Sequence, residues 1–221
     1  MARIWRLVVP EYPHHVTQRG VRSMDVFQTD EDRQSYLQFL AAEAKRFEVE
    51  ILVWCLMTNH VHFIAVPQRR DSLARAFGEA HRRYTRMRNF REGVRGYLFQ
   101  GRFSSCVLDE GHLLAAASYG ELNPVRAGIV KRAWAYPWSS ASFHAGRRKM
   151  DPLVKDQKLR GLVSNWEEFL AGATHVKDET IRKMSRTGRP AGDAAFVRLV
   201  ERLTARDLSK GKPGRPAKRG K

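Results

Sequence analysis

Two short apolar segments, residues 49–57 and 60–66, lie close together in the sequence, with only Thr58 and Asn59 between them. Both are rich in β-branched and aromatic side chains, which is typical of strands buried in a sheet. So short a connection joins strands that run antiparallel, because a parallel pair needs a crossover of a dozen or more residues. The sequence therefore predicts a pair of antiparallel strands, with Pro67 ending the second.

Strand-like and helix-like patterns alternate on both sides of this pair. The predicted order is strand, helix, strand, strand, helix, strand and helix, at residues 14–19, 30–47, 49–57, 60–66, 72–90, 102–108 and 110–122. This order matches the split β-α-β pattern of ferredoxin-like folds. We therefore expect an α+β fold with one antiparallel sheet and helices on one face. Right-handed crossovers favour strands 49–57 and 102–108 near the middle of that sheet.

Residues 1–145 form one predicted domain, and the character of the sequence changes after it. Residues 146–204 predict a helical C-terminal extension, in which Trp166 and Phe169 are the expected packing residues. Residues 205–221 are mostly Gly, Pro, Lys and Arg, with almost nothing to bury. We expect this basic tail to be disordered on its own.

Basic residues outnumber acidic ones by a wide margin. The chain holds 40 Lys and Arg against 23 Asp and Glu, which gives a formal net charge of +17 at pH 7. A charge of this size attracts polyanions, of which nucleic acid is the most common, although it does not bear on the fold. The composition therefore favours a nucleic-acid-binding protein over the alternative, a soluble protein that is merely basic.

No segment of the sequence suggests a membrane span or a secretory signal. Arg6 and Pro10 interrupt the N-terminal segment, and the longest apolar run, residues 51–57, is far shorter than the about 20 residues that a bilayer requires. Cys55 and Cys106 are too far apart in sequence to suggest a disulfide framework or a CxxC metal site. We therefore expect a cytoplasmic, nucleoid-associated protein without a membrane partner.

The segment His60-Val61-His62 carries the sharpest chemical signal. Side chains of a strand alternate between its faces, so both histidines project from one face, about 7 Å apart along the strand. That spacing allows two imidazoles to bind one divalent metal ion. The alternative is a polar strand face with two unconnected histidines, because a His-x-His pair is not specific by itself.

Tyr119 and Asn123 form a second signal, since residues four apart in a helix share a face. An amide oxygen one turn from a phenol could complete a metal site beside a nucleophile, and the small residues 115–118 leave room for a DNA strand. The alternative is ordinary: most helical tyrosines are core or rim residues, and an Asn before Pro124 is a common end of a helix.

The segment from Arg69 to Arg102 contains ten arginines and three acidic residues. The planar guanidinium is suited to phosphate because it bonds two oxygens at once. Aromatic residues that could stack on bases are interleaved with these arginines, namely Tyr84, Phe90, Tyr97 and Phe99. We favour DNA contact over the alternative, a solvated charged helix face, because the excess has one sign.

The tail contains Pro213-Gly214-Arg215-Pro216, with lysines nearby on either side, and Thr187-Gly188-Arg189-Pro190 is a weaker version of the same pattern. An arginine held extended between Gly and Pro resembles an AT-hook, which suits the narrow minor groove of A·T-rich DNA. The equally weighted alternative is a disordered basic tail that binds any nucleic acid through counterion release.

Several separated pieces of the chain resemble one known family, the REP-associated tyrosine transposases, which are relatives of the HUH single-strand DNA transposases. Order and spacing both fit over about residues 10–145. The pieces are His15-Val16-Thr17-Gln18-Arg19-Gly20, Leu56-Met57-Thr58-Asn59-His60-Val61-His62, Phe99-Gln100-Gly101-Arg102-Phe103 with Ser105, Tyr119 to Gly128, and Tyr136-Pro137-Trp138-Ser139-Ser140.

The resemblance implies a metal-dependent reaction on single-stranded DNA. His60 and His62 would bind Mg²⁺ or Mn²⁺, with Asn123 as a third ligand where the related transposases usually carry Gln. Tyr119 would attack a phosphodiester, leaving a 5′-phosphotyrosine and a free 3′-OH. His112, two turns earlier on the same helix, is a candidate helper, although a solvent-exposed histidine is the simpler interpretation.

The resemblance also implies a hairpin substrate similar to REP palindromes, recognised partly as single strand. The expected phosphate contacts come from the N-terminal part, the arginine-rich segment and the tail. These arginines are Arg19, Arg22, Arg75, Arg82, Arg83, Arg86, Arg102 and Arg215.

Two other functions stay open at this point, as does the oligomeric state. A non-catalytic DNA-binding protein, such as a repressor of its own locus, would need neither the histidines nor Tyr119. A metal-dependent nuclease that cleaves with water would use the histidines and leave Tyr119 idle. Relatives from insertion sequences act as dimers, whereas the long C-terminal extension favours a monomer.

Overall fold

The computed structural model describes residues 4–156, 158–173 and 178–208. Its centre is a four-stranded antiparallel sheet in the order β2-β3-β1-β4. The strands are β1 (His14–Arg19), β2 (Val49–Leu56), β3 (His60–Pro67) and β4 (Ser104–Val107). The predicted α+β class and the antiparallel sheet are confirmed.

The prediction that the second and fourth strands occupy the middle of the sheet is wrong, because β2 and β4 are its edges. The tight connection between β2 and β3 makes these two strands neighbours, so β3 takes the place between β1 and β2. Each helical crossover therefore passes over one intervening strand. The two central strands, β1 and β3, are the ones that carry His15, His60 and His62.

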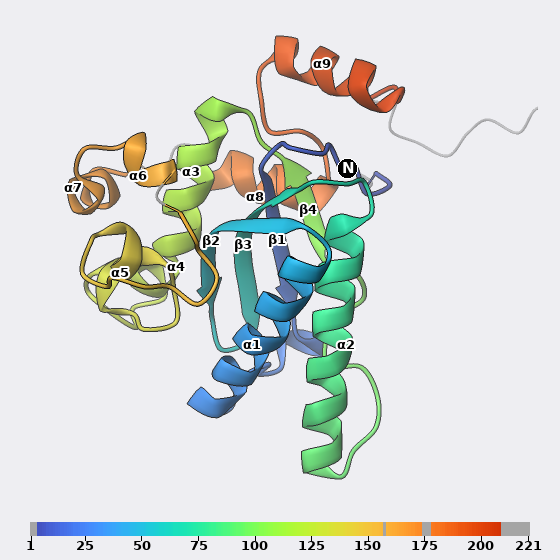
Figure 1. The fold of residues 1–221 in the computed structure, drawn as a ribbon, viewed down its shortest axis with the longest axis vertical. Helices are drawn as coiled ribbons and strands as arrows, with labels where there is room; N and C mark the ends of the chain where they lie inside the picture. Colours follow the sequence, from blue (N-terminus) through green and yellow to red (C-terminus); the bar gives the residue numbers. More distant parts are fainter. Residues whose placement is uncertain (1–3, 157, 174–177, 209–221) are drawn as a thin grey trace, which may run out of the picture.

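Helices cover both faces of the sheet (Figure 1). On one face lie α1 (Asp30–Arg46) and α2 (Ser72–Glu92), as predicted. The other face carries α3 (Glu110–Glu121) and α8 (Asp178–Thr187), so the prediction that helices cover one face only is wrong. These helices dock there because apolar side chains of this face, such as Val53 and Ile64, pack against Ala116, Ala117 and Ile181. The remaining helices are η1 (Val21–Ser23), α4 (Asn123–Arg126), η2 (Ala133–Ala135), α5 (Ala141–His144), α6 (Lys158–Gly161), α7 (Trp166–Ala171) and α9 (Ala194–Thr204).

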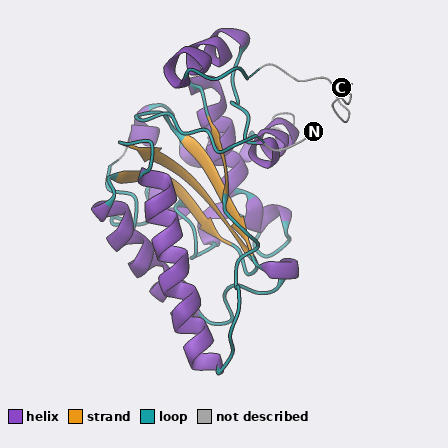
Figure 2. Ribbon diagram, turned by 90° about the vertical axis from the view of Figure 1, so that its right-hand side faces the viewer, coloured by secondary structure: helices purple, strands orange, loops and turns teal. Residues whose placement is uncertain are grey.

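Strand alternation places the side chains of β3 on two different faces of the sheet. Val61 and Phe63 of β3 project into the core beneath α1 and α2, where the Phe63 ring packs 5.2 Å from that of Phe77. Figure 2 shows the long helix α2 along this side of the sheet. His60 and His62, which alternate with them, project to the opposite face. One β-strand thus contributes to both the core and the polar face.

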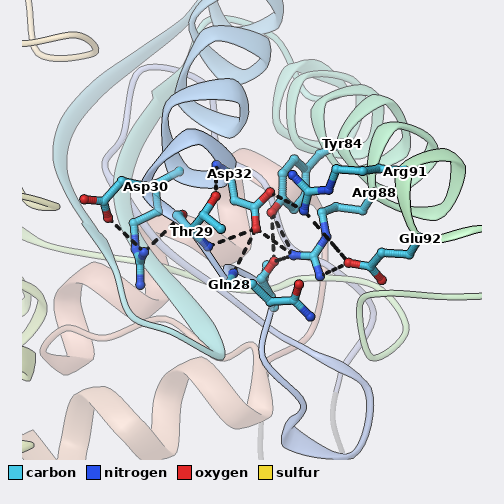
Figure 3. Close-up of polar contacts among 10 residues, drawn as sticks. Gln28, Thr29, Asp30, Asp32, Tyr84, Arg88, Arg91 and Glu92 are labelled. Carbon is cyan, nitrogen blue, oxygen red and sulfur yellow. Dashed lines mark hydrogen bonds and ion pairs between the residues drawn. The ribbon is translucent and has the colours of Figure 1, made fainter.

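A buried ion pair joins the start of α1 to the end of α2 (Figure 3). The Asp32 carboxylate accepts hydrogen bonds from the backbone N–H of Gln28 and Thr29 and pairs with Arg88 at 3.1 Å, with both side chains of this pair buried. Arg91 approaches the same carboxylate at 2.7 Å from the solvent side. Burial opposes ionisation of Asp32, but these hydrogen bonds and guanidinium groups outweigh it and lower its pKa.

The C-terminal part of the chain folds back on the sheet. Helix α8 packs against β4 and α3, and α9 contributes Phe196 and Val200 to a small apolar cluster with Leu7 and Val9. The division into residues 1–145, an extension to 204 and a tail stays a prediction. Within the described residues, no helix is both long and apolar enough to cross a membrane.

Arg88→Met leaves the buried Asp32 carboxylate with the partly exposed Arg91 as its only cationic partner among the described residues, so we expect a loss of about 3–5 kcal/mol in the free energy of unfolding. Arg91→Met, which removes a guanidinium that is 44% exposed, serves as the control with an expected loss of about 0–1 kcal/mol. Urea denaturation measures both. Equal losses for the two variants would contradict a dominant role of the buried pair.

The same pair sets a pH dependence. Because the pKa of Asp32 is lowered by folding, its stabilising contribution is present above the ordinary aspartate pKa of about 3.9 and is lost as the pH falls through the lower folded value. The stability difference between the wild type and Asp32→Asn should therefore shrink as denaturation is repeated below about pH 4. A constant difference would contradict this assignment.

Candidate functional site

A pocket of about 920 Å³ opens on the sheet face that carries α3 and α8. Its walls come from β1, β3, the segment before β4, the end of α3 with α4, and α8. The lining residues are His15, Thr17, Gln18, Arg19, His60, His62, Gln100, Arg102, Ser104, Tyr119, Asn123, Arg126, Arg182, Ser185 and Arg186. The pocket therefore gathers the predicted nucleophile and all three predicted metal ligands.

The pairing of β1 with β3 aligns the histidines. Thr17 lies opposite His62 and Arg19 lies opposite His60, so the polar side chains of both strands share one face. The ring centres of His60 and His62 are 5.1 Å apart, and the Tyr119 ring lies edge-on 5.5 Å from that of His62. The geometry thus places two imidazoles side by side next to one phenol.

Each of the two imidazoles has a hydrogen bond at Nδ1. His60 Nδ1 donates to the Asn59 side-chain oxygen at 2.6 Å, and His62 Nδ1 is hydrogen-bonded to His15 Nε2 at 3.1 Å. His15 in turn bonds through Nδ1 to the Ser185 hydroxyl of α8 at 2.6 Å. With Nδ1 used in this way, Nε2 is the atom on both His60 and His62 that could bind a metal ion.

Both imidazoles are held neutral. Burial, together with the positive charge of Arg19, lowers the pKa of His60 to about 4. Burial and then the neighbouring groups, beginning with His15 and His60, lower the pKa of His62 well below its ordinary value. The neutral form is the one that binds metals, because protonation removes the lone pair.

Asn123 and Arg126 support the backbone around Tyr119. The Asn123 amide nitrogen donates to the Tyr119 carbonyl at 2.8 Å, which leaves its side-chain oxygen as the atom that could reach a metal ion. Arg126 donates to the same carbonyl at 2.7 Å, and its guanidinium carbon lies 4.8 Å from the centre of the Tyr119 ring. A positive charge therefore lies against the ring of the predicted nucleophile.

A buried carboxylate anchors α3, the helix that carries Tyr119. Glu121 accepts hydrogen bonds from Ser140 and His144, each at 2.6 Å, and from the Trp166 indole at 2.7 Å. These partners come from α5, α7 and the residue before α5. The C-terminal end of α3 is thereby tied to two elements that follow it in sequence.

The predicted phosphate-binding arginines fall into separate places. Arg19 and Arg102 line the pocket, and Arg22 lies exposed in η1, just after β1. Arg82 and Arg86 line a second hollow beside α2. Arg215 lies outside the described residues.

Two of these arginines face α1 instead. Arg83 pairs with Glu43 of α1 at 2.7 Å. Arg75 pairs with Asp71 at 3.2 Å, and its guanidinium carbon lies 4.6 Å from the centre of the Phe47 ring at the end of α1. The predicted DNA-binding arginines of α2 are therefore divided between the α1 interface and the second hollow.

Some pocket residues were not among the predicted site residues. His15 lies two residues from Thr17 and four from Arg19 in β1, so strand alternation alone could have placed it on the face of the histidines. Arg182, Ser185 and Arg186 belong to α8, whose docking depends on packing far from it in sequence. His112 is bound to Asp109 at 2.7 Å at the start of α3 and is not among the lining residues.

Comparison with known protein families gives a match. The family model described as IS200-like transposase matches residues 9–119, just over half of the chain. A search of curated protein sequences finds no match.

Two solved structures are similar to this chain. One is a REP-associated tyrosine transposase bound to a REP hairpin, with a TM-score of 0.56 and 19% identity, covering 71% of this chain and 93% of that one. The other is a transposase candidate from Deinococcus radiodurans R1, with a TM-score of 0.39 and 17% identity, covering 57% and 97% respectively. The first likeness supports the fold, and the second is too weak to bear on it.

Glu121→Gln replaces one acceptor oxygen by an amide NH₂ that cannot accept hydrogen bonds from the donors around it. We expect a loss of about 1–3 kcal/mol in the free energy of unfolding, because at least one buried donor is left unpaired. The exposed Glu168→Gln is the matched control and should change stability by less than about 0.5 kcal/mol. Thermal and urea unfolding measure both, and an unchanged stability of Glu121→Gln would contradict the anchoring role.

Proposed function

We propose that this chain, which belongs to the IS200-like transposase family, cleaves and rejoins single-stranded DNA through Tyr119. The observation that carries the proposal is the pocket in which Tyr119 lies against His62 and Arg126, beside His60. Family membership supports a DNA transposase. The details of the reaction are inferred from the chemistry of these residues.

The donor set suits a divalent metal ion. His60 and His62 offer neutral Nε2 atoms, and Asn123 offers an amide oxygen in the same pocket. Among the residues that the structure describes, no three His, Cys, Asp or Glu side chains converge as a metal site, so a third protein ligand would be this amide. When bound there, Mg²⁺ or Mn²⁺ supplies Lewis-acid stabilisation of the scissile phosphate.

Tyr119 is the nucleophile of the proposed reaction. Its phenol oxygen forms a bond to phosphorus while the bond from phosphorus to the 3′-oxygen breaks. The phenol proton leaves to solvent, and the departing oxygen takes up a proton and becomes a free 3′-OH. The 5′-phosphotyrosine keeps the energy of the phosphodiester, so attack by a 3′-OH on this ester rejoins the strand without ATP.

The surrounding cations bind and orient the DNA. Arg126 lies over the Tyr119 ring, where its charge attracts the phosphate that Tyr119 attacks. Arg19, Arg102, Arg182 and Arg186 line the same pocket, and guanidinium groups suit phosphate oxygens. We infer a hairpin-forming DNA as substrate, because the solved transposase with the same fold is bound to a REP hairpin.

Tyr119→Phe separates this proposal from the two alternative functions. The protein is incubated with Mn²⁺ and a labelled hairpin oligonucleotide that carries single-stranded flanks, and SDS-stable adducts are counted. We expect an adduct with the wild type and none with Tyr119→Phe, while Tyr12→Phe, outside the pocket, forms it normally. Cleavage that persists in Tyr119→Phe would show a water-using nuclease, and binding without cleavage by the wild type would show a DNA-binding protein.

His15 is expected to hold His62 in the orientation and tautomer that present Nε2 to the metal ion. His15→Phe keeps a ring of similar shape and removes both hydrogen bonds. We expect Mn²⁺ affinity, measured by titration calorimetry in the absence of DNA, to fall by about 10- to 100-fold. His112→Phe, outside the pocket, is the control. Unchanged affinity in a folded His15→Phe protein would contradict the role of His15.

A further inference from the structure

A second hollow of about 920 Å³ lies beside α2, on the side of the sheet away from α8. We call it the aromatic hollow, and define it by α2 residues 74–90, loop residues 94–103 and Arg6. Its volume falls within the range of about 300–1,000 Å³ that holds small organic ligands. The reaction proposed above does not use it.

The mouth of the aromatic hollow carries the two most exposed large hydrophobic side chains of the described residues. Phe90 is 90% exposed and Tyr97 is 92% exposed, and Val94 between them is 50% exposed. Exposed apolar side chains that cluster at one place indicate a binding surface, whereas isolated exposed apolar side chains are common and do not indicate one. The mouth therefore offers two aromatic faces that nothing in the described chain covers.

The loop that presents Tyr97 is held against α2. Gly93 ends the helix in a left-handed conformation, and the Asn89 side chain donates to the Gly96 carbonyl at 2.9 Å. Figure 1 shows the segment after α2 running back alongside the helix towards β4. The two exposed rings are thus presented by a braced turn, at the end of α2 and the start of the returning loop.

The floor of the hollow is aromatic, and Arg6 lies over one of its rings, with its guanidinium carbon 3.6 Å from the centre of Phe103. Phe99 and Phe103 are buried there, and the His81 ring lies 4.2 Å from that of Phe99. Burial, with a smaller effect from Arg6, lowers the pKa of His81 to about 3, so this ring is neutral. On α2, a Cβ at Gly78 would meet no atom within 4 Å, so no side chain fills the hollow at this point of the helix. A flat, uncharged ring system fits such a floor.

The rim of the hollow is strongly basic. Five arginines line it, and no carboxylate does so among the described residues; the arginines are Arg6, Arg82, Arg86, Arg95 and Arg102. Arg82 is paired with Glu79. Within the described part of the chain, Arg86, Arg95 and Arg102 make no ion pair. An occupant with an aromatic part and a negatively charged backbone matches both the floor and the rim.

Arg102 joins this hollow to the active-site pocket, because it lines both. The wall between them is the segment 99–102, which is fastened to β1: the Gln100 N–H donates to the Arg19 carbonyl at 2.8 Å, and the Gln18 amide donates to the Gly101 carbonyl at 3.2 Å. A strand that leaves the pocket past Arg102 therefore arrives at the aromatic hollow.

We propose that the aromatic hollow binds an unpaired base of the DNA strand whose neighbouring phosphates lie in the active-site pocket. Tyr97 and Phe90 stack on the base, and Arg86, Arg95 and Arg102 bind the flanking phosphates. An unpaired base is the occupant that fits, since the bases of a duplex are stacked on one another and offer no free face to these rings. This inference rests on the proposed function, which supplies the DNA substrate. It adds the place on the protein where the single-stranded part of that DNA is recognised.

The test measures binding without cleavage, so that it does not depend on the chemistry of Tyr119. The full chain with Tyr119→Phe is titrated in EDTA against two forms of one labelled hairpin, one blunt and one with unpaired extensions on both sides of the stem. Fluorescence anisotropy gives the affinity, and 2-aminopurine placed along the extensions reports stacking.

We expect Phe90→Ala and Tyr97→Ala each to weaken binding of the extended hairpin by about 5- to 100-fold, with the blunt hairpin unaffected. A 2-aminopurine at one position of an extension should change fluorescence on binding, and lose that change in Tyr97→Ala. Arg86→Gln should lower the salt slope by about one unit, whereas the aromatic variants leave it unchanged. Met150→Ala removes an 80% exposed apolar side chain elsewhere and is the matched control.

The competing outcomes are distinct. Equal losses for both hairpins would place the duplex stem on the hollow and overturn the proposal. Unchanged affinity for both would overturn it too, while the proposed function stands as long as the parent protein binds DNA. A change in sedimentation of Tyr97→Ala without a change in DNA affinity would identify the patch as a contact between two copies of the chain. Failure of the parent protein to bind either hairpin would overturn the proposed function itself.

Discussion

The pairing of β1 with β3 is the constraint on which the rest of the site depends. These two strands are the centre of the sheet, and their register sets Arg19 opposite His60 and Thr17 opposite His62. A slip of one residue would turn every one of these side chains into the apolar core. The valine and phenylalanine residues that alternate with the histidines make such a slip costly, so the same packing that stabilises the sheet also fixes the face that carries His60 and His62.

Much of this arrangement could be predicted because it follows from local pattern. The alternation in residues 60–66 placed His60 and His62 on one face, and helical spacing placed Tyr119 near Asn123. The strand order could not be obtained in the same way, because strands 49–57 and 102–108 have the apolar composition of central strands and yet lie at the edges. Their outer sides are covered by residues remote in sequence, such as the backbone of Ser139 beside Cys55 and of Ala191 beside Leu108. The amino-acid composition of a strand indicates that the strand is buried. It does not indicate which part of the chain buries it.

The arginines show a second limit of sequence patterns. The sequence predicts DNA contact for the arginine-rich segment as a whole, but the neighbours of each arginine decide what it does. Glu43 engages Arg83 at 2.7 Å, whereas Arg86 is left for another partner. Of the four interleaved aromatic residues, Tyr84 and Phe99 are core residues and only Phe90 and Tyr97 are exposed. Local periodicity predicts which side of a helix a residue occupies. Whether its side chain is free to bind DNA depends on how that helix packs against other elements.

The hydrogen bond between His15 and Ser185 spans 170 positions of the chain. Contacts between such distant residues form late, since a long loop must close before they are made. During synthesis from the N-terminus, β1 and β3 leave the ribosome well before α8 exists. A growing chain therefore carries its histidines and Tyr119 in a pocket that still lacks one wall and two of its cations, Arg182 and Arg186. The pocket closes around Tyr119 only after α8 has been synthesised and has docked on the sheet.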